Sequence, residues 1–80
     1  MVTYKYLRFE ELEAKPKTKR FAVRNKTSDF ILGYVKWHGP WRRYCFFTID
    51  VFLIFDTGCL ADITDFINKL MAERKEKGNG

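Results

Sequence analysis

The most regular alternation of apolar and polar residues lies in the middle of the chain. In residues 19–26, Phe21 and Val23 point to one side and the charged residues to the other, which is typical of a half-buried strand. Residues 30–37 and 41–49 continue the pattern, and the short turn sequences TSD and HGP separate the three segments. Three consecutive strands joined by short turns predict an antiparallel meander.

A C-terminal helix is the clearest single element. Apolar residues recur at helical spacing from Leu60 to Met71, and polar residues take the positions between them. Asp56 and Thr57 precede this repeat and are favourable N-cap residues. The apolar stripe of the helix and the apolar face of the sheet each need a cover, and packing them together buries both. The predicted fold class is α+β: an antiparallel meander of three to four strands with the C-terminal helix packed on one face.

Two segments are ambiguous. Residues 3–9 are compatible with a short strand, and we expect residues 10–18 to form a loop with one helical turn at 10–14. Residues 50–56 are an apolar run that is either a fourth strand or a buried crossing segment, because periodicity alone does not separate the two. The 80 residues predict a single domain, with residues 1–18 partly flexible and residues 76–80 frayed.

Charge is distributed unevenly along the chain, which has a net charge of +5. Residues 15–43 contain nine basic residues and one acidic residue, whereas residues 44–66 contain four acidic residues and no basic residue. A basic half of this kind attracts nucleic acid in some proteins, and in others it is only a solvated surface. Composition leaves both possibilities open.

The stretch LGYVKWHGPWRRYCFF places many rings and cations together, and we expect several of them on the sheet face opposite the helix. Cations interleaved with rings on an open sheet can hold phosphates and stack bases. The alternatives are basic side chains that only cover exposed rings, and cation–π pairs within the sheet. Phe21, Trp37 and Phe47 are expected in the core instead. The predicted nucleic-acid contacts are Arg20, Arg24, Lys26, Tyr34, Lys36, Arg42 and Tyr44.

Contact with another protein, or self-association, is the alternative function. Trp41 follows Gly39–Pro40 at the expected hairpin tip, and residues 51–55 are apolar. Exposed apolar edges recruit partners. The predicted protein contacts are Trp41, Val51 and Leu53, and we expect a monomer or a weak homo-oligomer.

Residues suited to catalysis or cofactor binding are few, so we expect a non-enzymatic protein without a metal or other cofactor. Cys45, Cys59 and His38 are the only soft metal ligands, and they form no closely spaced pair. Two cysteines are too few for a disulfide framework, which favours buried free thiols. A nucleophilic Cys59 at the helix N-terminus, paired with His38, is the alternative. No apolar run is long enough to span a membrane, and residues 1–13 lack the pattern of a signal peptide. We therefore expect a cytoplasmic protein.

Three motifs occur in one order: LG-x-V-x-W at residues 32–37, WR-x-Y-x-FF at 41–47 and CL-x-x-I-x-x-FI-x-x-L at 59–70. Together they resemble a family of short uncharacterised proteins encoded by phages and mobile elements of bacteria and archaea. The resemblance implies a phage-type origin and a compact sheet-plus-helix fold, and it nominates no catalytic residue. We expect a non-enzymatic accessory protein of a phage or mobile element. In that family a proline-rich polar link usually follows the double phenylalanine, whereas this chain has TIDVFLI at residues 48–54.

Overall fold

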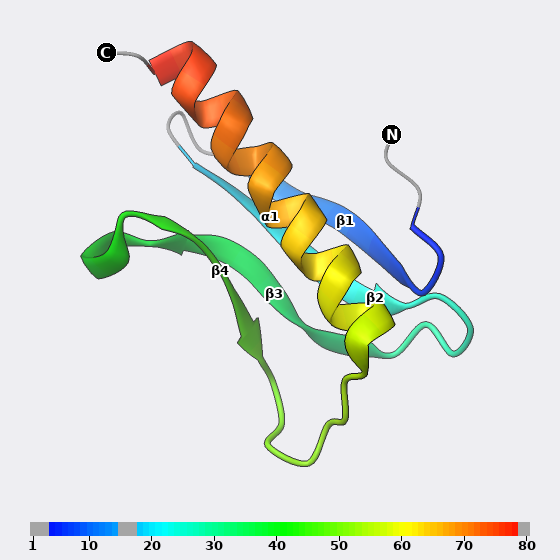
Figure 1. Ribbon diagram of the computed structural model, residues 1–80. Helices are drawn as coiled ribbons and strands as arrows, with labels where there is room; N and C mark the ends of the chain where they lie inside the picture. Colours follow the sequence, from blue (N-terminus) through cyan, green and yellow to red (C-terminus); the bar gives the residue numbers. More distant parts are fainter. Residues whose placement is uncertain (1–3, 15–17, 79–80) are drawn as a thin grey trace.

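Four strands follow one another in the sheet in the same order as in the sequence, and a C-terminal helix crosses one face of the sheet (Figure 1). This computed structural model describes residues 4–14 and 18–78, and the side chains of residues 4–12 and 18–74. All neighbouring strands are antiparallel, so the predicted α+β meander is confirmed. The elements are β1 (Leu7–Ala14), β2 (Lys19–Asn25), β3 (Ile31–His38), a 3₁₀ turn η1 (Gly39–Trp41), β4 (Arg43–Thr48) and α1 (Thr57–Gly78).

The core lies between α1 and one face of the sheet. The helix contributes the buried residues Ile63, Phe66 and Leu70, whose spacing of three and four keeps them on one side of the helix. The sheet contributes five more buried side chains, from all four strands: Leu7, Phe21, Val23, Val35 and Tyr44. Leu60 was expected in this seam, but half of its surface is exposed. The preceding residue, Cys59, packs against the core. One residue corresponds to a rotation of about 100° around the helix, so the Leu60 side chain points away from the core.

Phe66 is the centre of a cluster of aromatic rings that joins the helix to β1 and β2. Its ring stacks on Phe9 with centroids 4.0 Å apart, and Phe21 meets it edge-on at 4.8 Å. Tyr4 adds a second edge-on contact at 6.3 Å. Aromatic pairs in these arrangements contribute about 0.5–1.5 kcal/mol each beyond the area they bury. The cluster therefore determines which face of the sheet the helix covers.

The faces of β4 are opposite to our expectation. Tyr44 is buried beneath α1, where its hydroxyl oxygen accepts a hydrogen bond of 3.1 Å from the backbone N–H of Lys19. Phe47, which was expected in the core, lies on the other face and opposite Tyr34. Two other expected core residues are confirmed: Phe21 is buried, and Trp37 packs against the core with its ring 5.4 Å from that of Tyr44.

The turn between β3 and β4 explains this inversion. Residues 39–42 form the connection, so His38 pairs with Arg43 and Trp37 pairs with Tyr44. Residues directly opposite in an antiparallel pair share a face. A register shift of one residue moves every side chain of a strand to the other face. The expected strand began at residue 41, whereas β4 begins at Arg43 after a residue in the left-handed conformation, Arg42.

Residues 10–14 form the second half of β1, so the expected loop and helical turn are wrong. The segment pairs with β2, with a bulge between Glu11 and Glu13. Leu7 is fully buried, and Phe9 packs on the core from the same face, so burial of these side chains overrides the weak strand propensity of the glutamates. Acidic side chains and a bulge on an edge strand also discourage pairing with another sheet. Residues 1–3, 15–17 and 79–80, which belong to the segments predicted to be flexible or frayed, lie outside the described residues.

Residues 49–56 are neither a strand nor a buried segment. They contain a turn at 51–52 and otherwise irregular backbone before the helix. The Asp50 carboxylate accepts a hydrogen bond of 2.8 Å from the backbone N–H of Phe52. Phe55 turns inward and meets the Phe46 ring edge-on at 5.5 Å, whereas Val51, Phe52 and Ile54 are exposed.

Gly33 allows β3 and β4 to approach closely. A Cβ atom at this position would overlap the carbonyl oxygen of Phe47 and lie 2.9 Å from atoms of the Phe46 ring. At Gly39, in the hairpin turn, a Cβ atom would meet nothing within 4 Å. The two glycines therefore differ in what an added methyl group would do.

We predict that Gly33→Ala lowers the free energy of unfolding by about 1–3 kcal/mol, the usual cost of overpacking. Gly39→Ala is the matched control, and it should cost less than Gly33→Ala, because the added methyl group is restricted only by the neighbouring Pro40 and meets no other atom within 4 Å. Urea unfolding followed by tryptophan fluorescence measures both. Equal effects of the two changes would contradict the close contact at Gly33.

Candidate nucleic-acid interface

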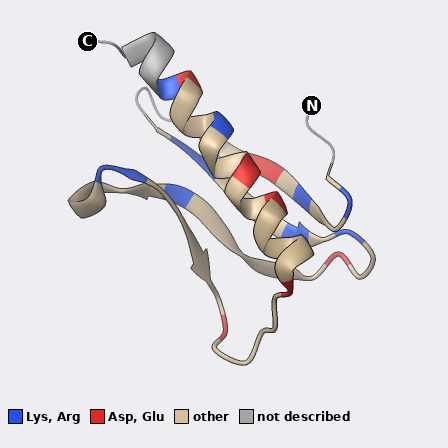
Figure 2. Cartoon of the chain, viewed as in Figure 1, with Lys and Arg blue, Asp and Glu red and all other residues tan. Residues whose placement is uncertain are grey.

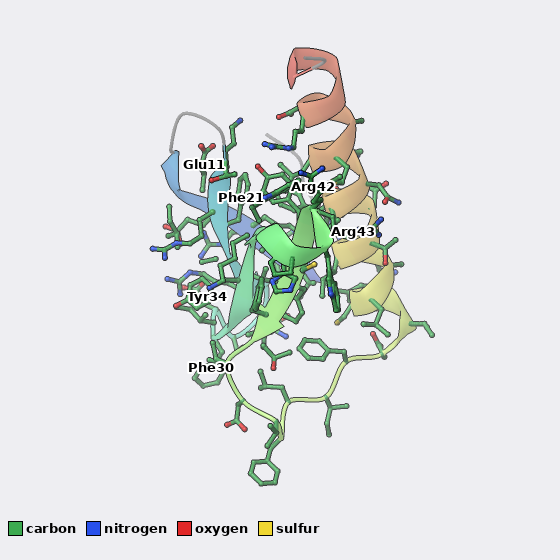
Figure 3. The ribbon with its side chains drawn as sticks, turned by 90° about the vertical axis from the view of Figure 1, so that its left-hand side faces the viewer. Glu11, Phe21, Phe30, Tyr34, Arg42 and Arg43 are labelled. Atoms are coloured by element: carbon green, nitrogen blue, oxygen red, sulfur yellow. The ribbon has the colours of Figure 1, made fainter. Side chains whose placement is uncertain are left out.

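The sheet face turned away from α1 carries cations and rings from all four strands. Because neighbouring residues of a strand alternate between faces, the register assigns each position. Figure 3 shows Tyr34 on the side of the sheet away from the helix, and Figure 2 shows basic positions on each strand. This face, termed the open face, consists of Arg8, Glu10, Arg20, Ala22, Arg24, Tyr34, Lys36, His38, Arg43, Cys45 and Phe47.

Long side chains form a continuous layer over the middle of the open face. Ala22 is buried, although it lies between the helix-facing residues Phe21 and Val23 and therefore points to the open side. Its partners on the neighbouring strands are Glu10 and Tyr34. Tyr34 is half-buried in this layer.

Cations and rings alternate along β3 and β4 on the open face. The Lys36 Nζ atom lies 4.6 Å from the centroid of the Phe47 ring, a cation–π contact. The His38 ring meets Phe47 edge-on at 5.8 Å and Trp41 at 5.0 Å. Phe47 pairs directly with Tyr34 across the two strands. The cation–π pairing anticipated from the sequence is therefore present, and it places the exposed Lys36 above the half-buried Phe47.

Acidic groups neutralise the β1 side of the open face. The Arg24 Nε atom donates to Glu10 at 3.0 Å, and its guanidinium also donates to the backbone oxygen of Asp29 at 3.1 Å. Arg8 forms an ion pair with the Asp29 carboxylate. The hydrogen bond from Arg8 holds the pKa of Asp29 below its ordinary value. Arg8 and Arg24 are therefore less suited to phosphate than the exposed cations Lys36 and Arg43.

Only four of the seven predicted nucleic-acid contacts lie together on the open face: Arg20, Arg24, Tyr34 and Lys36. Lys26 lies in the turn after β2, where its ammonium donates to the backbone oxygen of Tyr4 at 2.6 Å. Arg42 ends the 3₁₀ turn and belongs to no strand. Tyr44 is a core residue, so its assignment to this face is wrong. Arg43 and Phe47 were not among the predicted contacts, because Arg42 and Tyr44 were expected on the open face, whereas pairing of Trp37 with Tyr44 turns Tyr44 toward the helix.

The residues of the alternative protein contact do not come together. Trp41 is exposed at the hairpin tip, where β4 starts. Val51 is exposed beyond the other end of β4, and Leu53 is half-buried. The predicted apolar segment and the tryptophan are thus two separate surfaces.

The cysteines offer no activated nucleophile. Both Cys45 and Cys59 are free, as expected, but they are half-buried rather than buried. Burial, aided by the neighbouring Asp56, raises the pKa of the Cys59 thiol, which disfavours the thiolate. Cys59 packs on the helix side of the sheet and His38 lies on the open face, so the considered pair does not form. Within residues 4–14 and 18–78, no three His, Cys, Asp or Glu residues are grouped so that they could hold a metal ion.

The described part of the chain includes no helix that is both long and apolar enough to cross a membrane.

Carboxylates of α1 fix the N-terminal segment and the start of the helix. The Tyr4 hydroxyl donates to Asp65 at 2.7 Å, and the backbone N–H of Tyr6 donates to Asp62 at 3.1 Å. Asp56 caps the helix by accepting a hydrogen bond of 2.9 Å from the Cys59 N–H, which confirms it as the N-cap. These bonds hold the helix in place over β1 and leave its acidic side chains on the surface opposite the open face.

Hydrogen bonds also lower the pKa values of two of these carboxyl groups. Backbone N–H donation by Cys59 is the main cause at Asp56, and donation by Tyr4 followed by Lys69 is the main cause at Asp65. A carboxylate with a lowered pKa stabilises the fold at pH values above its unfolded pKa, about 3.9. That contribution is lost as the pH falls through the folded pKa.

The fold and its exposed residues define a class: a small two-layer α+β protein with a cationic, aromatic sheet face. The chain is 44% identical over 72 residues to the "Uncharacterized 9.3 kDa protein" of Acholeplasma phage L2. The match covers 89% of this chain and 91% of the phage protein. The chain therefore belongs to the family of this small phage protein, in agreement with the resemblance noted above. No family model matches the chain, and no solved structure matches it.

We predict that the free energy of unfolding is nearly constant above about pH 5 and falls on acidification below about pH 4. Asp56→Asn keeps a side-chain oxygen for the cap and removes one titrating group, since asparagine and aspartate are comparable N-caps. Urea unfolding at pH 7 and pH 3 should therefore show a smaller acid-induced loss in Asp56→Asn than in the wild type. An unchanged loss would contradict the role of this carboxylate.

Proposed function

We propose that this protein is a non-enzymatic accessory protein of a phage or mobile element that binds single-stranded nucleic acid on its open face. The observation that carries the proposal is the alternation of exposed cations with accessible rings along β3 and β4. Lys36 lies over Phe47, Tyr34 is the cross-strand neighbour of Phe47, and Arg43 begins the next strand. The membership in a phage protein family supports the biological setting.

Single strands fit this face better than duplexes. The rings of Tyr34 and Phe47 lie on a sheet, and unpaired bases can stack on such rings, each for about 1–3 kcal/mol. Four-stranded sheets are used in this way by known RNA-binding modules. Reading a duplex requires an element that enters a groove, whereas the open face is a surface of strands. A base stacked on Phe47 would displace the Lys36 ammonium from this ring, and the ammonium could then contact a phosphate.

Charge supports the same orientation. The open face carries the exposed cations Arg20, Lys36 and Arg43, whereas the sequence of α1 contains equal numbers of acidic and basic residues and has no net charge. A face with an excess of cations orients a polyanion as it approaches. The phosphates would meet the open face, and the helix would remain turned away from them.

We predict that labelled single-stranded DNA or RNA binds at low salt with Kd between about 10⁻⁶ and 10⁻⁴ M, the usual range of non-specific affinity. Three phosphate contacts correspond to a slope of log K against log salt near −2, since each contributes about −0.7 on a single strand. Fluorescence anisotropy at several salt concentrations measures both quantities. A duplex of the same length should bind more weakly.

Paired variants locate the site. Phe47→Ala should weaken binding about 5-fold to 150-fold, which corresponds to one stacked base, and Lys36→Ala should make the salt slope shallower. Lys69→Ala on the helix removes the same charge and should leave affinity nearly unchanged. Absence of binding below about 100 μM at low salt would refute the proposal, and so would equal effects of Lys36→Ala and Lys69→Ala.

A further inference from the structure

Two exposed apolar surfaces lie at opposite ends of β4. At the hairpin tip, the Trp41 side chain is 68% exposed beside Arg42. Beyond the other end, Val51, Phe52 and Ile54 are 87%, 86% and 92% exposed. Figure 1 shows the turn η1 and the segment between β4 and α1 well apart. The six residues of β4 separate them by about 20 Å at the usual rise per residue.

The charges around these surfaces are opposite in sign. Residues 39–43 at the tip contain Arg42 and Arg43 and no acidic residue, whereas residues 49–56 contain Asp50 and Asp56 and no basic residue. Pairing two tips, or two loops, would bring like charges together. Pairing a tip with a loop brings unlike charges together around an apolar centre, which is the arrangement that complementary interfaces use.

Local contacts hold both surfaces in place before any partner arrives. The Arg42 N–H donates to the Gly39 oxygen at 3.0 Å, and the His38 ring supports Trp41 edge-on at 5.0 Å. In the loop, the Phe52 N–H donates to the Asp50 carboxylate at 2.8 Å. Surfaces that are already ordered lose less entropy on association.

The backbone at Arg42 gives a further indication. Its φ of 53° lies in the left-handed region, which glycine adopts most readily. The chain places a long cationic side chain there instead. An arginine at this strained position is explained if its charge contributes to a contact.

We propose that the tip of one copy docks on the 49–56 loop of a second copy, so that the protein associates head to tail. Trp41 would enter the apolar surface of Val51, Phe52 and Ile54, and Arg42 would face Asp50. The two contacting surfaces differ, so the contact is heterologous and extends into short chains or closes into a ring. Each copy keeps its open face free, which places successive open faces along one assembly. The contact does not depend on nucleic acid.

Sedimentation velocity in the absence of nucleic acid tests the proposal. A small interface of this type is weak and transient, so the weight-average mass should rise between about 10 μM and 1 mM, a range that corresponds to modest binding free energies. The rise should be smaller at high salt, because the charges at the rim are screened. A wild-type protein that stays monomeric throughout this range would overturn the proposal and leave the two surfaces to another partner.

Complementation of two variants distinguishes head-to-tail from like-to-like contact. The tip variant carries Trp41→Ala with Arg42→Gly, and the glycine keeps the left-handed backbone without strain. The loop variant carries Phe52→Asp. Each variant alone should lose concentration-dependent association, whereas an equimolar mixture should form dimers and nothing larger, because one intact tip meets one intact loop.

Phe30→Asp is the matched control for the loop variant, since Phe30 is 72% exposed and belongs to neither surface. Its association should equal that of the wild type. Circular dichroism verifies that every variant is folded. A tip variant that still associates by itself, or a mixture that remains monomeric, would overturn head-to-tail docking. None of these outcomes depends on whether the open face binds nucleic acid.

Discussion

The contact between Phe66 and the rings of Phe9 and Phe21 decides how the rest of this protein is arranged. A chain of 80 residues buries only about 60% of its unfolded surface, so a few large side chains must supply much of the stability. Rings that bury roughly 150–250 Å² each are the efficient choice. Once they hold α1 against one face of the sheet, the other face has no helix to cover it.

The two layers then differ in charge as well as in chemistry. Tyr4 and Tyr6 bind the carboxylates Asp65 and Asp62 of the helix, and Asp56 caps its start. These three carboxylates thereby hold the helix on the sheet. Most basic residues of the strands lie on the opposite side, although Lys19 of β2 forms an ion pair with Glu73 of the helix. Glu10 and Asp29 neutralise the β1 edge of that side. The same interactions that build the fold produce a polar molecule with one cationic, aromatic face.

Sequence periodicity predicted strands at residues 19–26 and 30–37, close to the observed β2 and β3, and it also predicted the helix and the two-layer fold, because these segments have strong local patterns. It failed at residues 10–14, where the strand is stabilised by burial of Leu7 and by pairing with β2 rather than by its own composition. The faces of β4 also could not be derived. They depend on the conformation of the turn at residues 39–42, and a shift of one residue exchanges Tyr44 with Phe47. Two of the seven predicted contacts followed that error, since Arg43 and Phe47 lie on the open face in place of Arg42 and Tyr44.

Small proteins of phages often have little room for separate functional domains, so their surfaces must serve both folding and contact. Here the proposed contacts use the face that the helix leaves uncovered and the two ends of β4. The most direct test of this account is a nuclear Overhauser measurement on the protein in solution. The Phe66 ring should show strong cross-peaks to Phe9 and Phe21 and none to Tyr34 or Phe47. Cross-peaks from Phe66 to Tyr34 or Phe47 would place the helix on the cationic face and contradict the account.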